Sequence, residues 1–199
     1  MFEKFIESIN KSTCLSEDDI CYLRKQSKIK KYTKGETIIS SGIIVKHIYV
    51  VLEGCVRLYY NVDGKDKTAF FYNEGDFIWA NKSLNNDEPT QKNFEDIEDY
   101  TIIQIDKSAF YQLVESSTSF ETVTKYEKER ELMAYQQQIA YFITLSPEER
   151  FIKLLETNGV LFQRVSQQYI ASYLGVSAET LSRIKKRVFE KYKEEMCTI

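Results

Sequence analysis

Residues 166–188, SQQYIASYLGVSAETLSRIKKRV, carry the pattern that decides the C-terminal fold. Ser166 is a good N-cap residue for a first helix, and Ser177 can cap a second one. Between them, Gly175 supplies a residue that turns sharply at positive φ. Apolar residues of both helices repeat at helical spacing: Ile170, Leu174, Leu181, Ile184 and Val188. Two short helices joined by a glycine turn, with a small Ala171 where they would meet, predict a helix-turn-helix.

The second of these helices presents a polar face opposite its apolar stripe. Arg183 can form a bidentate pair with guanine, and Glu179 can accept a hydrogen bond from cytosine. Basic residues follow, well placed for phosphates, and the simpler alternative is a solvated basic surface helix. The expected DNA-binding residues are Ser177, Glu179, Thr180, Ser182, Arg183, Lys185, Lys186 and Arg187.

The run SAETLSR, residues 177–183, resembles the DNA-binding segment of the Crp/Fnr superfamily, the group that contains the catabolite activator protein. Glu179, Thr180 and Arg183 match the family pattern, whereas Ala178 stands where many members carry a first base-contacting arginine. The resemblance implies a transcriptional regulator that binds double-stranded DNA as a homodimer, with RNA polymerase as a candidate partner.

Composition and charge fit a soluble globular protein of 199 residues with 43% hydrophobic and 29% charged residues. The net charge of −3 argues against a nucleic-acid partner for the chain as a whole. Residues 177–193, however, hold six basic and two acidic residues, so the local charge favours one. No apolar run approaches the roughly 20 residues of a membrane span. The N-terminus lacks a signal-peptide core, so we expect a cytoplasmic protein without a membrane partner.

From residue 30 to residue 106 the pattern changes to short strands and turns. Five of the seven glycines fall here at intervals of 7 to 12 residues, and β-rich runs lie between them. Asp63-Gly64, placed between two such runs, is a strong hairpin signal. Regular short strands at this spacing predict a β-sandwich or barrel.

Three short motifs in this region resemble those of a cyclic-nucleotide-binding-type jelly roll: KGETI at 34–38, the Glu53-Gly54 turn and GDFI at 75–78. Family members that bind the nucleotide continue with a glycine–glutamate–leucine start and an arginine–serine pair. Here Trp79 and Ala80 replace the glycine and glutamate, and Thr90 and Gln91 replace the arginine and serine. A buried phosphodiester without a cationic partner is badly under-compensated, so we expect no binding of cyclic AMP or cyclic GMP.

An unidentified small-molecule effector remains an open alternative for this domain. Its expected pocket residues are Phe71, Phe77, Trp79, Thr90 and Gln91. Aromatic side chains on a barrel strand can equally fill the barrel themselves, and the sequence leaves both interpretations open.

A long helix is expected over residues 107–143, with an apolar stripe in its second half: Leu132, Tyr135, Ile139 and Phe142. By family resemblance this stripe pairs two subunits; the alternative is a helix lying across the β domain. Ser146-Pro147 then opens a new helix with a capping box that Glu149 completes. The segment from Val160 to Val165 is expected to contribute one or more strands of a wing.

Metal, redox and enzymatic functions find little support in the residues. An iron–sulfur cluster needs about four closely spaced thiolates, and the cysteines are scattered: Cys14, Cys21, Cys55 and Cys197. They fit reduced thiols, and the single histidine, His47, excludes a multi-histidine metal site. No catalytic motif occurs, so no cofactor or enzyme activity is expected. The remaining rival is a module whose C-terminal helices contact a protein rather than DNA.

The resulting prediction is an α+β protein with three parts. Residues 1–106 form N-terminal helices and a jelly-roll (double-stranded β-helix) sensor domain. Residues 107–145 form a dimerisation helix, and residues 146–199 a winged-helix-like helix-turn-helix domain.

Overall fold

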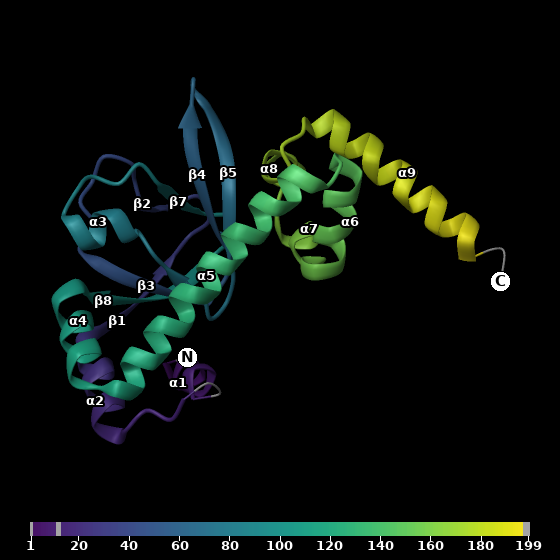
Figure 1. Cartoon of the computed structure of the whole chain (residues 1–199). Helices are drawn as coiled ribbons and strands as arrows, with labels where there is room; N and C mark the ends of the chain where they lie inside the picture. Colours follow the sequence, from purple (N-terminus) through teal and green to yellow (C-terminus); the bar gives the residue numbers. More distant parts are fainter. Residues whose placement is uncertain (1, 11–12, 197–199) are drawn as a thin grey trace. The chain divides into compact units, whose positions relative to one another are not determined.

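Two four-stranded antiparallel sheets form the β part of the protein in a computed structural model, which describes residues 2–10 and 13–196 (Figure 1). The strand orders are β1-β8-β3-β6 and β2-β7-β4-β5. The expected jelly roll is confirmed. The strands are β1 Ser27–Tyr32, β2 Thr37–Ile39, β3 His47–Glu53, β4 Val56–Val62, β5 Lys65–Tyr72, β6 Phe77–Ile78, β7 Asn93–Asp96 and β8 Tyr100–Asp106.

Apolar side chains from both sheets are buried in one core. Val50 and Ile103 are fully buried on the first sheet, as is Phe94 on the second. Leu58, which is also buried, lies opposite Phe94 in the β4–β7 pair of the second sheet. Burial alternates along β7, where Phe94 lies between two half-buried neighbours, whereas most residues of β3 and β8 are buried irrespective of the face they lie on.

The hairpin between β4 and β5 has the turn that the sequence predicts. Asp63 adopts φ 52° and Gly64 φ 74°, and positive φ at both central residues is the signature of a type I′ turn. Asn61 Oδ1 accepts a hydrogen bond from the Gly64 backbone N–H at 3.1 Å, which reinforces the turn.

Strand β1 is an edge strand that apolar patterning does not reveal. Its sequence is SKIKKY, and its exposed residues include Lys28, Lys30 and Lys31. It pairs with β8 over its whole length, from Ser27 opposite Ile105 to Tyr32 opposite Tyr100. The other edge of this sheet is the two-residue strand β6.

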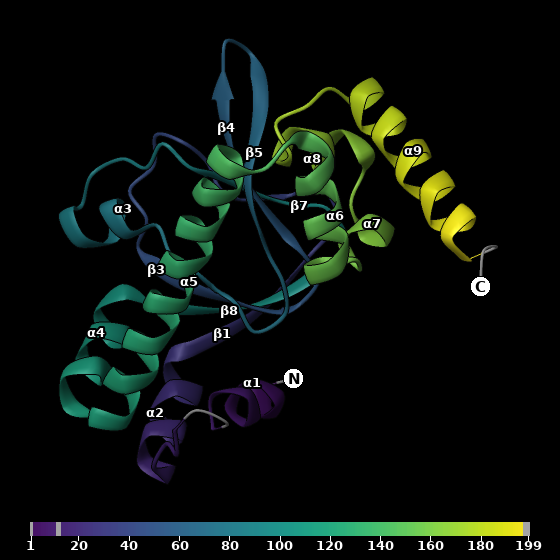
Figure 2. The same ribbon diagram turned by 45° about the vertical axis from the view of Figure 1, so that its right-hand side comes forward.

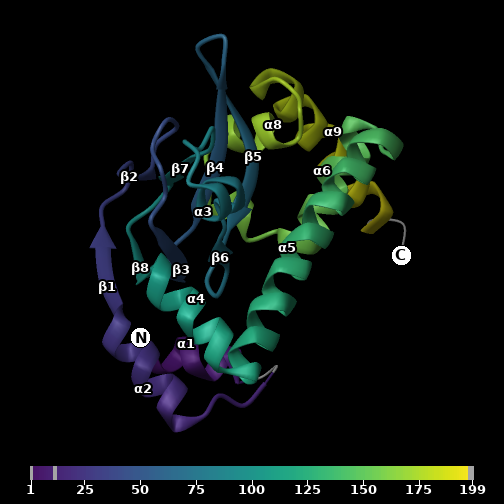
Figure 3. The same cartoon turned by 60° about the vertical axis from the view of Figure 1, so that its left-hand side comes forward.

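The N-terminal helices α1 (Phe2–Ile9) and α2 (Glu17–Gln26) are confirmed as expected. Ser16 caps α2 in a capping box, because its hydroxyl accepts from the Asp19 N–H at 3.1 Å. Helix α2 lies beside α4 and the first sheet, as Figure 3 shows from the side of β1. The short helix α3 (Asn81–Asn86) lies between β6 and β7 in the chain.

The single long helix expected over residues 107–143 is wrong: two helices form, α4 (Lys107–Ser116) and α5 (Thr118–Thr144). Ser117 breaks the helix in an extended conformation, and its hydroxyl accepts from the Phe120 N–H at 3.2 Å. The same Ser117 hydroxyl donates a hydrogen bond to the Asp19 carboxylate at 2.7 Å. A serine that hydrogen-bonds the backbone locally competes with helix continuation, which explains the break.

The C-terminal part is helical, with α6 (Pro147–Asn158), α7 (Leu161–Arg164), α8 (Gln167–Tyr173) and α9 (Ala178–Met196). The predicted capping box at Ser146 and Glu149 is confirmed. The expectation of wing strands at Val160 to Val165 is wrong, because α7 occupies this segment. Leu161 of α7 and Val165, the extended residue that caps its C-terminus, are both buried.

The chain divides into two units that continue into one another through β4, β5 and α5. One comprises residues up to 60 together with 70–133, and the other comprises residues 61–69 and 134 onward. The functional boundaries expected after residues 106 and 145 stay a prediction. Among the described residues, no helix combines the length and hydropathy that crossing a bilayer requires.

Candidate nucleic-acid interface

A helix-turn-helix forms from α8 and α9, as the sequence predicts (Figure 2). The Ser166 hydroxyl accepts from the Tyr169 N–H at 3.4 Å at the start of α8. Gly175 turns the chain at φ 70°, and the Ser177 hydroxyl accepts from the Thr180 N–H at 3.2 Å. Each cap satisfies a donor that the first helical turn leaves without an intrahelical partner.

The two helices are fixed by a shared apolar core in the second unit. Phe151 of α6 is fully buried, and its ring meets the ring of Phe162 edge to face at 5.3 Å. The predicted inward residues of α8 and α9 are buried as well: Ile170, Ala171, Leu174, Leu181, Ile184 and Val188. A rigid core of this kind fixes which side of α9 meets the solvent.

The polar face of α9 is exposed where the sequence places it. Glu179 and Arg183 are exposed, whereas Thr180 is partly buried. The Arg183 guanidinium donates to the Thr180 hydroxyl at 3.4 Å. Hydrogen bonding to Ser177 lowers the pKa of Glu179, so this carboxylate is charged at neutral pH. Of the other predicted residues, Lys185 is partly buried and the exposed ones are Ser177, Ser182, Lys186 and Arg187.

Two of the basic side chains have acidic neighbours. Arg187 lies 2.5 Å from the Glu148 carboxylate of α6, and Lys186 lies 3.8 Å from Glu190. Ion pairs between such solvent-exposed groups contribute little to stability. A DNA phosphate can therefore replace the carboxylate of Glu148 or Glu190 as the ion-pair partner at small cost.

Most of the residues predicted to line an effector pocket are buried in the first unit. Phe71, Phe77, Trp79 and Thr90 are buried, and Gln91 is exposed. The Phe77 and Trp79 rings stack with centroids 5.4 Å apart. Whether these residues bind an effector stays a prediction.

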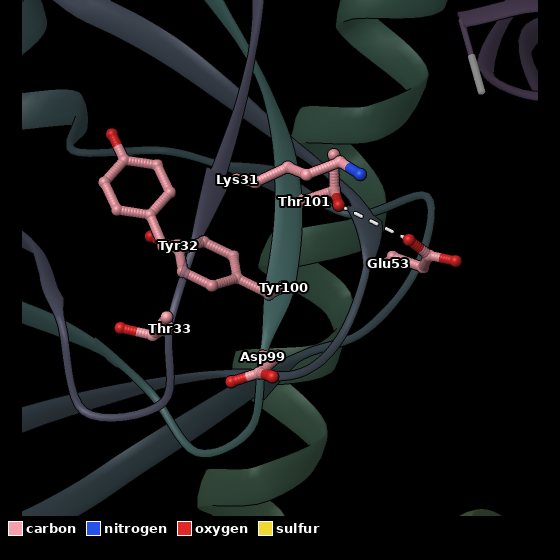
Figure 4. A pocket seen from close by; sticks show the side chains of 7 residues that line it. All are labelled: Lys31, Tyr32, Thr33, Glu53, Asp99, Tyr100 and Thr101. Atoms are coloured by element: carbon pink, nitrogen blue, oxygen red, sulfur yellow. Dashed lines mark hydrogen bonds between the residues drawn. The ribbon is translucent and has the colours of Figure 1, made fainter.

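A cavity of about 350 Å³ lies elsewhere in this unit, at the ends of β1, β3 and β8 (Figure 4). Its lining includes Lys31 and Glu53, and the Glu53 carboxylate accepts from the Thr101 hydroxyl at 3.3 Å. The stacked rings of Tyr32 and Tyr100, 4.8 Å apart, project away from that pair. None of the five predicted pocket residues lines this cavity.

A buried acidic group lies next to these tyrosines. Asp96 is only 2% exposed, and neither of its carboxylate oxygens has a hydrogen-bond partner among the described residues. Burial raises the pKa of Asp96 to about 8, and the nearby Glu36 and Glu95 carboxylates add to the rise. The nearby Tyr100 hydroxyl lowers the pKa of Asp96 and so offsets part of this rise, although the two groups do not form a hydrogen bond of normal geometry. Asp96 is therefore mostly a neutral carboxylic acid at pH 7.

Part of the predicted dimerisation stripe on α5 is open to solvent. Leu132 is 55% exposed and Ile139 is 60% exposed. They are seven residues apart and so share one helical face. Phe142 is 44% exposed and Tyr135 is partly buried. Ile143, four residues after Ile139, extends the exposed face and was not among the predicted residues.

Comparisons with known proteins agree with this architecture. Residues 29–117 match the cyclic nucleotide-binding domain family. The chain is 28% identical over 194 residues to the nitrogen fixation regulation protein FixK of Bradyrhizobium diazoefficiens, covering 88% of this chain and 79% of FixK.

Solved structures share the fold over most of the chain. FixK2 from Bradyrhizobium japonicum superposes with a TM-score of 0.72 at 21% identity, covering 83% of this chain and 85% of FixK2. The c-di-GMP-responsive global regulator CLP of Xanthomonas campestris also gives 0.72, at 16% identity over 88% of this chain and 93% of CLP. Residues 29–117 thus match a cyclic nucleotide-binding domain, and the chain as a whole is similar in sequence to FixK and in fold to FixK2 and CLP.

Proposed function

We propose that this chain is a sequence-specific DNA-binding transcriptional regulator that acts as a homodimer. The observation that carries the proposal is the exposed polar face of α9 on a capped, well-packed helix-turn-helix. Recognition helices read base edges with side chains near their N-terminal end, where Glu179 and Arg183 lie. The regulatory function in the name of the relative FixK supports the same proposal.

The exposed apolar face of α5 supports the homodimer. Leu132, Ile139 and Ile143 present adjacent apolar side chains, and an exposed apolar stripe of this kind marks an interaction surface. A second copy of the same helix is the simplest complement, because two such stripes bury each other as in a coiled coil.

Selection of random duplexes by the purified protein, followed by sequencing of the retained pool, tests DNA binding and dimerisation together. We expect a palindromic motif whose half-sites lie about one helical turn, roughly 34 Å, apart. An enriched motif without two-fold symmetry would contradict the dimer. A pool without enrichment would contradict sequence-specific binding.

Arg183→Ala should weaken binding to the selected duplex by about 1–3 kcal/mol, because a bidentate pair with guanine is lost. Binding to a random duplex of equal length should change little. Lys186→Ala is the matched control one helical turn along: it should weaken binding to both duplexes alike and reduce the salt slope by about one unit. Equal losses on both duplexes for Arg183→Ala would show that this side chain contacts phosphate only.

We further propose that the sensor domain has lost the cyclic-nucleotide phosphate cassette. Residues 77–99 contain no arginine, and side chains of α5 contact residues of the β part of this unit. Lys92 Nζ donates to the Trp79 carbonyl at 3.1 Å, and Lys128 Nζ lies 5.1 Å from the Trp79 ring centroid. The Tyr72 hydroxyl donates to the buried Glu131 carboxylate at 2.6 Å.

Calorimetric titration with cyclic AMP and with cyclic GMP should therefore show no binding heat. The reason is that residues 77–99 supply no arginine to form the bidentate pair with the phosphate of the nucleotide. A catabolite activator protein titrated under the same conditions provides the positive control. Micromolar binding of either nucleotide to this chain would overturn the proposal.

A further inference from the structure

Arg150 stands at a position in α6 that helix stability alone does not favour. It is the fourth residue of the helix, one position after Glu149 of the capping box. Backbone N–H groups at this end carry partial positive charge, so a cation here is disfavoured. Something other than the stability of α6 must favour an arginine at this position.

The Arg150 guanidinium joins the ends of two other helices in the second unit. Nη1 donates to the carbonyl of Leu145, directly after α5, at 2.8 Å. Nε and Nη2 both donate to the carbonyl of Leu174, the C-cap of α8, at 3.2 and 3.1 Å. Helix ends leave carbonyls without intrahelical donors, and one side chain here serves two such ends.

The ring of Phe142 completes this arrangement. The Arg150 guanidinium carbon lies 4.7 Å from its centroid, within cation–π range. The ring also occupies space that only a glycine leaves at the turn, because a Cβ on Gly175 would lie 2.7 Å from Phe142 Cε1. We call Arg150, Phe142 and Gly175 the hinge latch.

We propose that Arg150 is a positioning residue that fixes the angle between the end of α5 and the helix-turn-helix. This inference rests on the proposed function, since two copies paired through α5 would then hold their recognition helices at one defined separation. The latch thus sets which half-site spacing the dimer accepts. Base preference within each half-site would still come from α9.

The planar guanidinium with its forked donors is what allows one side chain to serve both carbonyls. A lysine offers a single point charge and cannot reproduce the fork. Arg150→Ala and Arg150→Lys are therefore the informative variants. Lys153→Ala is the matched control, because Lys153 lies on the same helix and pairs with Glu156 at 3.3 Å on its surface.

The first measurement is amide hydrogen exchange of the free protein, which needs no DNA. Loss of charge-assisted hydrogen bonds should speed exchange about tenfold in residues 143–147 and 173–178 of Arg150→Ala. Arg150→Lys should recover only part of the protection, and Lys153→Ala should match the unaltered protein. Unchanged exchange in Arg150→Ala would overturn the latch.

The second measurement uses the palindromic duplex selected by the unaltered protein, together with versions that have one base pair added or removed at the centre. For Arg150→Ala, the preference for the original spacing should fall about tenfold, while discrimination against a mutated half-site base is kept. Faster exchange with an unchanged spacing preference would reduce Arg150 to a structural role and overturn the positioning role. If the unaltered protein selects no duplex, both the proposed function and the positioning role of Arg150 are contradicted. Amide hydrogen exchange of the free protein then still tests whether the contacts of the hinge latch stabilise the two helix ends.

Discussion

Asp96→Asn will be more stable than the unaltered protein at pH 7, and the difference will grow with pH. The folded-state pKa of Asp96 is raised to about 8, whereas an unfolded aspartate ionises near pH 4. Between these values the unfolded chain releases a proton that the folded protein keeps. The stability of the folded protein is therefore complete below about pH 4 and is lost progressively as the pH rises towards 8. Asparagine has the same shape and does not titrate, so it removes this loss.

Urea unfolding at pH 5, 6, 7 and 8 measures the effect. The difference in unfolding free energy between variant and unaltered protein should widen by roughly 1.4 kcal/mol per pH unit and level off above pH 8. Infrared spectroscopy gives an independent readout: a protonated carboxylic acid band at pH 7 in the unaltered protein and none at that position in the variant. Parallel stability curves would show that Asp96 is ionised in the folded protein.

Gly54→Ala will destabilise the first unit strongly. Gly54 adopts φ 100°, and a Cβ at this position would lie 2.4 Å from Tyr100 Cβ. A left-handed backbone costs an ordinary residue about 1–2 kcal/mol, and forced overpacking costs about 1–3 kcal/mol more. The expected loss of unfolding free energy, about 2–5 kcal/mol, is a large share of the stability of a typical domain.

Gly42→Ala separates the two contributions to this loss. Gly42 has a similar φ of 92°, but a Cβ added there would meet no described atom within 4 Å. Its replacement should therefore cost only the conformational part, about 1–2 kcal/mol. Equal losses at both glycines, measured by urea unfolding, would show that Tyr100 moves aside without cost.

Local signals explain what the sequence predicts correctly. The helix-turn-helix depends on caps, a glycine and a short apolar repeat, all within residues 166–188. The Asp63-Gly64 hairpin is equally local. The outward face of α9 follows from the same repeat, so its candidate DNA-binding residues could be chosen without a structure.

Features that depend on distant partners could not be predicted in this way. Strand β1 is rich in lysine and forms because β8 pairs with it. The helix break at Ser117 involves Asp19, which lies 98 residues earlier. The role of Arg150 could not be predicted from the sequence, because its carbonyl partner Leu174 lies 24 residues further along the chain and no local pattern indicates that contact.

The lysines of β1 also bear on how the protein behaves when crowded. An edge strand exposes backbone groups that a strand from another molecule can pair with, which starts aggregation. Lys28, Lys30 and Lys31 place charges along that edge, and such charges repel another copy of the same strand. We therefore expect a concentrated solution of this protein to stay dispersed instead of joining edge to edge through β1.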